Sequence, residues 1–125
     1  MSDQQPGALV RRAEEVEYET VGAAEGLLKG VLIGAEHGAP NLAIRRFVLE
    51  PGANVPKHTN AIEHEQYVLE GEYEVGIGDE VYSVEPGDSL FIPAGAVHWY
   101  QNKGDQQGAF LCAVPTGDDE IRLTD

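Results

Sequence analysis

Residues 87–102 read Gly87-Asp-Ser-Leu-Phe-Ile-Pro93-Ala-Gly95-Ala-Val-His98-Trp-Tyr-Gln-Asn102, and they contain two short apolar runs separated by a turn. Proline and glycine mark that turn at Pro93 to Gly95. Similar short runs rich in Val, Ile, Tyr and Phe, each bounded by turn residues, lie at 65–69, 72–77, 80–84 and 109–115. Short strands at regular spacing, joined by tight turns, are typical of an antiparallel sandwich or barrel with few helices.

Two longer apolar stretches precede this region and flank a loop at Ala35 to Pro40. Both stretches, Leu28 to Ile33 and Asn41 to Glu50, are predicted to be strands. The second has apolar side chains on both faces, which is typical of a strand buried between two sheets. Pro51 and Gly52 then predict a turn.

The length of 125 residues fits a single domain with one hydrophobic core. We expect residues 1–25 to form an N-terminal arm with a weakly alternating edge strand at 11–20. Residues 26–116 should form the barrel. Residues 117–125 are acidic and polar, and their simplest interpretation is a solvated C-terminal tail.

The formal net charge is −14, from 22 acidic and 8 basic residues. Like charges repel, so nucleic acid and anionic membranes are excluded as partners. An acidic, lysine-poor composition resembles proteins from salt-loving microbes, which predicts that salt stabilises the fold; a merely acidic mesophile protein is the alternative. Cys112 is the single cysteine, so no internal disulfide forms, and without an apolar leader or a run long enough to span a membrane we expect the cytoplasm.

Three histidines occur in a spacing that could serve a metal ion. His58 and His64 are six residues apart, and His98 lies on a distant predicted strand. Neutral imidazole binds borderline transition metals, and a site needs several such groups brought together by the fold. Taken singly, each could equally be a surface histidine or a hydrogen-bonded core histidine.

The residues around these histidines resemble those of the cupin superfamily. Residues 87–102 match the second cupin motif, G-x5-P-x-G-x2-H-x3-N, at every defined position. Upstream, Pro51-Gly52, five further residues, His58 and a run ending at Gly71 resemble the first motif. The resemblance implies an all-β double-stranded β-helix, which is the small jelly-roll or cupin barrel.

The first motif departs from the common cupin form at two positions. Asn60 stands where a second histidine is usual, and His64 stands where glutamate is usual. A subgroup of small microbial cupins, which includes manganese-binding members with four histidine ligands, carries His-x-His-x3-His here. The resemblance therefore implies that His58, His64 and His98 are metal ligands and that Asn60 takes the fourth place. Asn60 could donate its carbonyl oxygen, hold a water ligand or leave a position open.

The implied cofactor is one divalent transition metal, with manganese or iron favoured and nickel, copper or zinc possible on the same donors. A cupin that has lost its metal is the alternative. The resemblance implies a metal-dependent oxidoreductase of dioxygenase type acting on a small organic molecule. The second interpretation is a non-catalytic module that binds or senses a metabolite or metal, because a shared fold does not settle the chemistry. Neither the substrate nor a general base is identified by the sequence.

Other residues have two interpretations each. Glu63 and Glu65 are either outer partners of the metal ligands or a charged loop in solvent. One face of the last predicted strand should point inward, and it carries Phe110, Cys112 and Val114. Five aromatic residues could line the barrel or belong to ordinary core: Trp99, Tyr100, Tyr67, Phe47 and Phe91.

Two expectations concern the surface. His37 lies outside both motifs and is expected to be a surface residue. Barrels of this kind commonly pair, so we expect a homodimer in which the apolar strand Gly30 to Ile33 is a candidate contact; ordinary core is the alternative.

Overall fold

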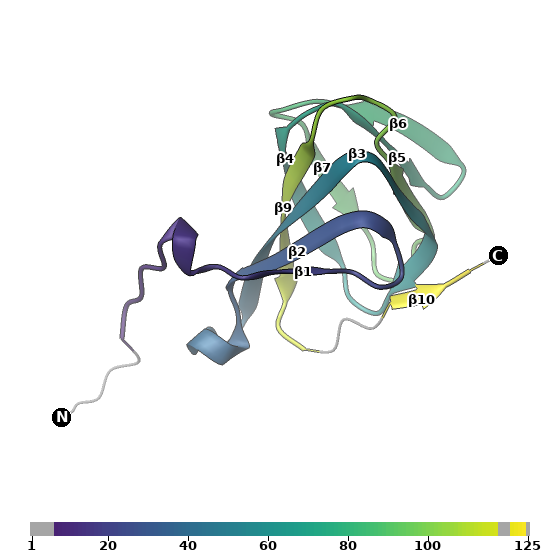
Figure 1. Cartoon of the computed structure of the whole chain (residues 1–125). Coiled ribbons are helices and arrows are strands. Elements are labelled where there is room, and N and C mark those ends of the chain that lie inside the picture. The colour runs from purple at the N-terminus through teal and green to yellow at the C-terminus, as the bar shows by residue number, and fades with distance from the viewer. Residues whose placement is uncertain (1–6, 118–120, 125) are drawn as a thin grey trace.

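A computed structural model describes residues 7–117 and 121–124 of the chain, and nearly all of its regular structure is β-strand (Figure 1). Two short 3₁₀ segments, Ala13–Glu15 (η1) and Ala35–His37 (η2), are the helical elements of the described residues. The strands are β1 (Tyr18–Thr20), β2 (Glu25–Ile33), β3 (Leu42–Asn60), β4 (His64–Glu70), β5 (Tyr73–Ile77), β6 (Glu80–Val84), β7 (Ser89–Ile92), β8 (His98–Gln101), β9 (Gly108–Pro115) and β10 (Ile121–Leu123).

All neighbouring strands pair antiparallel in one curled sheet. The order is β6-β5-β8-β3-β9-β4-β7, with β2 and β10 also paired to β3, and β1 paired to β2. Strands distant in sequence lie side by side, and the sheet curls around a central core (Figure 1). The predicted all-β barrel is confirmed, and every short run that the turn signals bounded forms a strand.

The long strand β3 connects the two halves of the barrel. Its residues 42–49 pair with β9, and its residues 54–58 pair with β8. Gly52 lies between these halves with a φ of 84°, a conformation that glycine adopts without steric cost. The prediction of a turn at Pro51 and Gly52 is therefore wrong. The chain does not reverse there, because the strand bends and continues to Asn60.

Aromatic rings fill part of the core. The ring centroid of Phe110 lies 5.2 Å from that of Phe47 and 5.3 Å from that of Tyr100, and both pairs are stacked. The prediction for the last strand is confirmed, since Phe110, Cys112 and Val114 are all buried. The aromatic prediction is wrong for Tyr67 and Phe91, which are 48% and 57% exposed on the outer face. Their positions alternate with inward-facing neighbours in β4 and β7.

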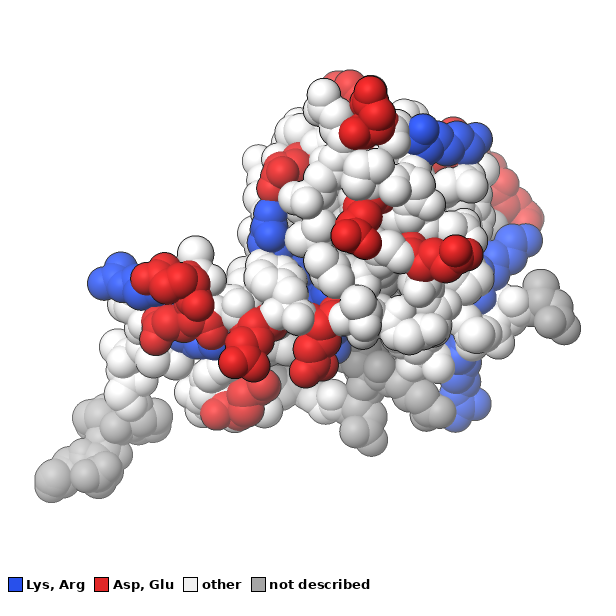
Figure 2. Space-filling view, in the orientation of Figure 1, with Lys and Arg blue, Asp and Glu red and all other residues white. Residues whose placement is uncertain are grey.

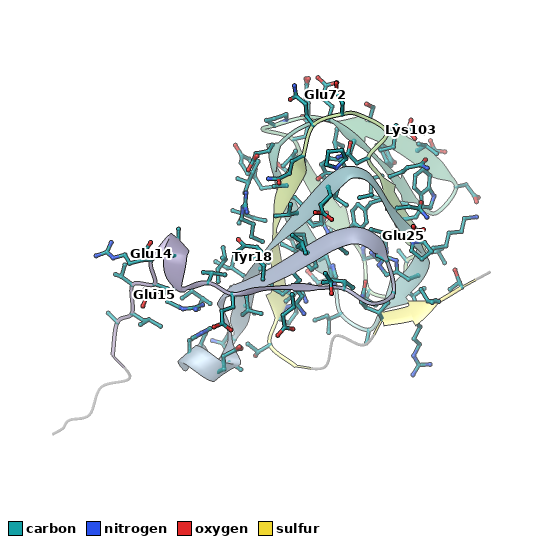
Figure 3. All side chains as sticks on the ribbon, in the orientation of Figure 1. Glu14, Glu15, Tyr18, Glu25, Glu72 and Lys103 are labelled. Atoms are coloured by element: carbon teal, nitrogen blue, oxygen red, sulfur yellow. The ribbon has the colours of Figure 1, made fainter. Side chains whose placement is uncertain are left out.

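The two ends of the described chain pack against strands that flank the core. Tyr18 in β1 pairs opposite Gly30 in β2, and the Arg11 guanidinium donates to the carbonyl oxygens of Val31 and Leu32 at 2.8 and 2.7 Å. The chain's own arm therefore covers part of the strand considered as a dimer contact, and Figure 3 shows Tyr18 over this region.

The described part of the C-terminal segment is also paired. Ile121 lies opposite Asn60 and Leu123 opposite His58, so β10 lies against the end of β3 that carries two predicted ligands. This strand falls in the segment expected to be a solvated tail.

No helix among the described residues is long and apolar enough to cross a membrane. Figure 2 shows acidic side chains spread over the face that β1 and β2 present.

Candidate functional site

A cavity of about 70 Å³ lies inside the barrel and is lined by all four predicted metal ligands. Its walls come from strands β2, β3, β4, β8, β9 and β10 and from the segment before β2. The lining residues are Val21, Ala23, Leu27, Lys29, Arg45, Phe47, Val55, Pro56, His58, Asn60, His64, Gln66, His98, Tyr100, Phe110, Ile121 and Leu123. Most are apolar, so the polar groups that face the cavity stand in a water-poor environment.

Three imidazoles converge on this cavity from three strands. His58 in β3 pairs opposite His98 in β8, and their ring centroids are 4.1 Å apart. His64, the first residue of β4, has its ring centroid 6.0 Å from that of His98. All three are buried, with His98 only 1% exposed. The sequence prediction that these distant histidines could meet is consistent with this geometry.

Backbone carbonyls orient two of the rings. The Nδ1 atom of His58 lies 2.8 Å from the carbonyl oxygen of Pro56, and that of His98 lies 3.0 Å from the carbonyl oxygen of Ala96. A carbonyl oxygen can only accept, so Nδ1 carries the proton in both bonds and the lone pair lies on Nε2. This tautomer is the one that binds a metal through Nε2, and such a bond fixes the ring orientation of a ligand.

Asn60 provides an oxygen beside these rings. It faces the same way as His58, two residues earlier on β3, and it is 5% exposed. Its Oδ1 atom is buried and has no hydrogen-bond partner among the residues that the structure describes. A buried carbonyl oxygen of this kind costs free energy unless something else bonds to it.

The donor set fits a divalent transition metal in its chemistry. Three imidazole nitrogens and one amide oxygen line one cavity, and such donors suit ions of the first transition row. Within residues 7–117 and 121–124, however, no group of three or more His, Cys, Asp or Glu side chains is already arranged to hold an ion.

A second row of polar side chains crosses the cavity wall. Gln66, Cys112 and Arg45 are direct neighbours on β4, β9 and β3. The Gln66 amide donates to the Tyr100 hydroxyl at 2.7 Å, and the Arg45 guanidinium donates to the Cys112 sulfur at 3.5 Å. The Oε1 atom of Gln66 is buried with no hydrogen-bond partner among the described residues.

Two groups in or beside this row, the Tyr100 hydroxyl and the Cys112 thiol, have shifted pKa values. Burial raises the pKa of the Tyr100 hydroxyl, so the phenol stays protonated. Burial also raises the pKa of the Cys112 thiol, but a hydrogen bond with His64 and the charges of His64 and Arg45 outweigh it, so the net shift is downward.

Three further residues with sequence-based predictions, Glu63, Glu65 and His37, lie outside the cavity. Glu63 and Glu65 are exposed and do not line the cavity. The interpretation as a charged loop in solvent holds for Glu63, whereas Glu65 is an outward-facing residue of strand β4. A hydrogen bond between the side chains of Glu65 and Glu63 raises the pKa of Glu65. His37 also lies outside the cavity, where its Nδ1 accepts from the Gly34 backbone at 3.0 Å.

Among the lining residues that sequence reasoning missed are Lys29, Arg45, Gln66, Ile121 and Leu123. Arg45 had a signal, since it alternates in phase with the inward-facing Phe47 and Leu49. A charged residue in the middle of an inward apolar row indicates either a buried ion pair or a binding group. The two residues of β10 had no signal, because their segment is polar and short.

The chain belongs to the cupin family, because residues 45–114 match the family model of the cupin domain. It is similar to a protein from Streptomyces cyaneus called polyketide synthase CurC, with 33% identity over 86 residues that cover 68% of this chain. The chain spans about half of CurC, since the match covers 53% of that protein.

Solved structures agree with the family. The chain is similar to the polyketide cyclase RemF from Streptomyces resistomycificus, with 28% identity and a TM-score of 0.84, covering 94% of this chain and 87% of that one. A cupin-2 domain from Rhodospirillum rubrum has 23% identity and a TM-score of 0.80, covering 98% and 84% of the two chains. The second likeness shows the jelly-roll fold alone.

Proposed function

We propose that this chain is a metal-dependent cupin enzyme that converts a small oxygenated organic molecule. His58, His64 and His98 would hold one divalent ion, and Asn60 would supply an oxygen to it or to a water beside it. One observation carries the proposal: a single cavity is lined by three buried imidazoles and by the buried amide oxygen of Asn60, which has no hydrogen-bond partner within residues 7–117 and 121–124. Several imidazoles brought to one place by the fold are what a transition-metal site needs.

Manganese or iron is the preferred ion, in keeping with the resemblance to the four-histidine manganese cupins. Nickel, copper and zinc accept the same donors, and affinity alone does not separate them. When bound, the ion would act as a Lewis acid on a carbonyl or enolate oxygen of the substrate. Three nitrogen donors and one oxygen donor leave room for that oxygen on a six-coordinate ion.

The chain's own residues would position the substrate and exclude water. Phe47, Phe110 and Tyr100 form a stacked aromatic wall that favours a flat, conjugated molecule. The Gln66 amide is fixed by its bond to Tyr100, which aims its Oε1 as an acceptor for a substrate hydroxyl. A cavity of about 70 Å³ admits a small molecule or one end of a larger one.

The reaction we favour is cyclisation of an oxo-substituted chain. The names of CurC and RemF support it, since both belong to polyketide biosynthesis. The second candidate is the dioxygenase-type oxidation implied by the sequence motifs, and the third is binding without turnover. The aromatic wall and the open coordination positions are compatible with cyclisation, with oxidation and with binding alone.

An oxygen electrode and an absorbance assay separate these reactions. The metal-loaded protein is incubated with linear triketones, phenols, diketones and organic acids. Cyclisation gives an aromatic product and consumes no oxygen, whereas dioxygenation consumes oxygen in proportion to product. Binding without any product, across the whole panel, would favour the non-catalytic module.

Measuring bound metal tests the claim that His58, His64 and His98 hold an ion. Protein purified without a histidine tag is loaded with Mn²⁺, desalted and analysed for bound metal. We expect His58→Ala, His64→Ala and His98→Ala each to lower retained manganese at least tenfold. The matched control is His37→Ala, which removes a histidine outside the cavity and should leave retention unchanged. Equal retention by all four variants would place any bound ion elsewhere.

A further inference from the structure

We infer that Gln66 and Tyr100 form a hydroxyl-recognition pair in the wall of this cavity, so that the ligand of the pocket is a phenol or an enol. The inference deepens the proposed function, because it names a class of substrate for the same cavity. It rests on the proposed function only in that the bound molecule would be the substrate. The pair contains none of the proposed metal ligands, and its bonds to a hydroxyl need no ion.

Gln66 supplies the acceptor of the pair. Its side chain lines the cavity from β4 and is 4% exposed. The Nε2 atom donates to the Tyr100 hydroxyl at 2.7 Å and to the Cys112 sulfur at 3.8 Å, so the amide is held at its nitrogen. The Oε1 atom is buried and has no hydrogen-bond partner within residues 7–117 and 121–124. A buried oxygen of this kind costs free energy, and a donor on the ligand would remove that cost.

Tyr100 supplies the donor of the pair. In the bond with Gln66 the Tyr100 oxygen is the acceptor, so this bond does not use the hydroxyl proton. A phenol keeps its proton at neutral pH. The side chain lines the cavity from β8, and its ring is stacked on that of Phe110 with 5.3 Å between the centroids, which fixes the direction of the ring. The proton is therefore available to an oxygen atom inside the cavity.

A ligand hydroxyl can satisfy both members of the pair at once. Its oxygen accepts from Tyr100 while its proton is donated to the Gln66 Oε1, and the bond from Gln66 to Tyr100 closes the circle of hydrogen bonds. A carbonyl or ether oxygen accepts but cannot donate, so it would leave the Gln66 Oε1 without a partner. A water molecule can make the same bonds, and a ligand hydroxyl reproduces them when it displaces the water.

The rest of the wall favours a flat ligand. The rings of Phe47, Phe110 and Tyr100 are stacked on one another, and a planar conjugated molecule packs well against such rings. The centroid of the Tyr100 ring lies 5.7 Å from that of His98 and 6.5 Å from that of His58, so a hydroxyl bound by the pair would lie near these imidazoles. Phenols and enols combine a planar framework with a hydroxyl, whereas a saturated alcohol lacks the planar framework.

Binding of phenol and toluene tests the pair. The two probes have nearly the same shape, and only phenol carries a hydroxyl. Both are titrated by NMR into the full chain after chelator treatment, so that the result does not depend on a bound metal. Gln66→Met removes the acceptor while keeping a side chain of similar length, and Tyr100→Phe removes the hydroxyl while keeping the ring. Circular dichroism checks that each variant is folded.

Two control variants make the same changes at the surface. Tyr67→Phe removes a hydroxyl from the outer face of β4, where Tyr67 is 48% exposed. Gln107→Met replaces an exposed glutamine that does not line the cavity. Both controls should bind the two probes as the wild-type chain does.

The measured quantity is the affinity for phenol relative to that for toluene. We expect this ratio to fall about threefold to tenfold in Gln66→Met and in Tyr100→Phe, because each variant loses one hydrogen bond to the phenol hydroxyl. No detectable binding of phenol to the wild-type chain, an unchanged ratio in either folded variant, or an equal fall in the controls would overturn the inference. Should Gln66→Met prove unfolded, Tyr100→Phe still decides the matter, since its ratio must fall.

The two proposals fail in different ways. Gln66→Met should retain manganese at the wild-type level, and a loss of manganese would make Gln66 a ligand of the ion and overturn the inference. A phenol preference that depends on the pair, in a chain that retains no manganese, would leave the pair standing and remove the metal enzyme. Retained manganese without any effect of the pair on phenol binding would do the reverse.

Discussion

Replacing Asn102 with alanine should destabilise the fold strongly without touching the proposed metal ligands. Asn102 ends the second motif and is 1% exposed. Its side-chain amide donates to the carbonyl oxygens of Leu49, Glu50 and Gln106 at 3.1, 3.3 and 2.9 Å, and its Oδ1 accepts from the Gly104 backbone at 3.1 Å. The side chain thus ties the end of β8 to the bend in β3.

The size of the effect follows from these contacts. The amide has two N–H donors, so its three acceptors count as about two full bonds, and the bond accepted from Gly104 adds one more. At about 1 kcal/mol net for each bond, Asn102→Ala should lower the free energy of unfolding by roughly 3 kcal/mol. For a chain of this length, that corresponds to a fall in melting temperature of roughly 12 °C. Urea unfolding followed by circular dichroism measures the change, and retained manganese per folded chain should stay at the wild-type value.

Asn60→Ala should behave in the opposite way, which makes the pair a matched comparison. The Asn60 oxygen has no hydrogen-bond partner among the described residues, so the metal-free variant should lose less than about 1 kcal/mol while manganese retention falls. Asn54→Ala, at an exposed position of β3, is the control for asparagine loss. An Asn102→Ala variant as stable as Asn54→Ala would refute the reasoning.

Three further predictions concern packing, charge and assembly. Gly76→Ala should cost about 1–3 kcal/mol in urea unfolding, because the added Cβ would lie 2.0 Å from the Trp99 Nε1; Gly22→Ala, with open space around it, should cost little. The net charge of −14 predicts a higher melting temperature in 1 M KCl than in dilute buffer, and an unchanged value would contradict the proposed self-repulsion. Sedimentation velocity at micromolar concentration should give a homodimer, and a monomer at both low and high salt would exclude it.

The strands could be predicted from sequence because turn chemistry and alternation are local. Glycine and proline bounded the runs at 80–84 and 89–92, and the structure has strands at those residues. The same logic failed at Gly52, since a glycine with positive φ serves a reversal and a bend within one strand equally well. Which of the two occurs depends on β8 and β9, the partners of β3, which are distant in sequence.

The site could be predicted only in part. The resemblance to the cupin motifs, and not spacing alone, implied that His58, His64 and His98 share a cavity, because motif residues recur at fixed places on this barrel. Lys29 was missed because nothing local distinguishes an inward lysine from one that extends to solvent. Arg45 was missed although it alternates in phase with Phe47 and Leu49, which is the one local signal that it faces inward. Their shared orientation depends on the register of β2 against β3, which two separate apolar runs do not specify.

The claim that these imidazoles hold one ion is tested most directly by anomalous diffraction. A crystal grown with Mn²⁺ is measured on both sides of the manganese absorption edge. The account predicts a single anomalous peak per chain, bonded to the Nε2 atoms of His58, His64 and His98 and next to the Asn60 oxygen. A cavity with no peak, in a crystal grown at saturating Mn²⁺, would contradict it.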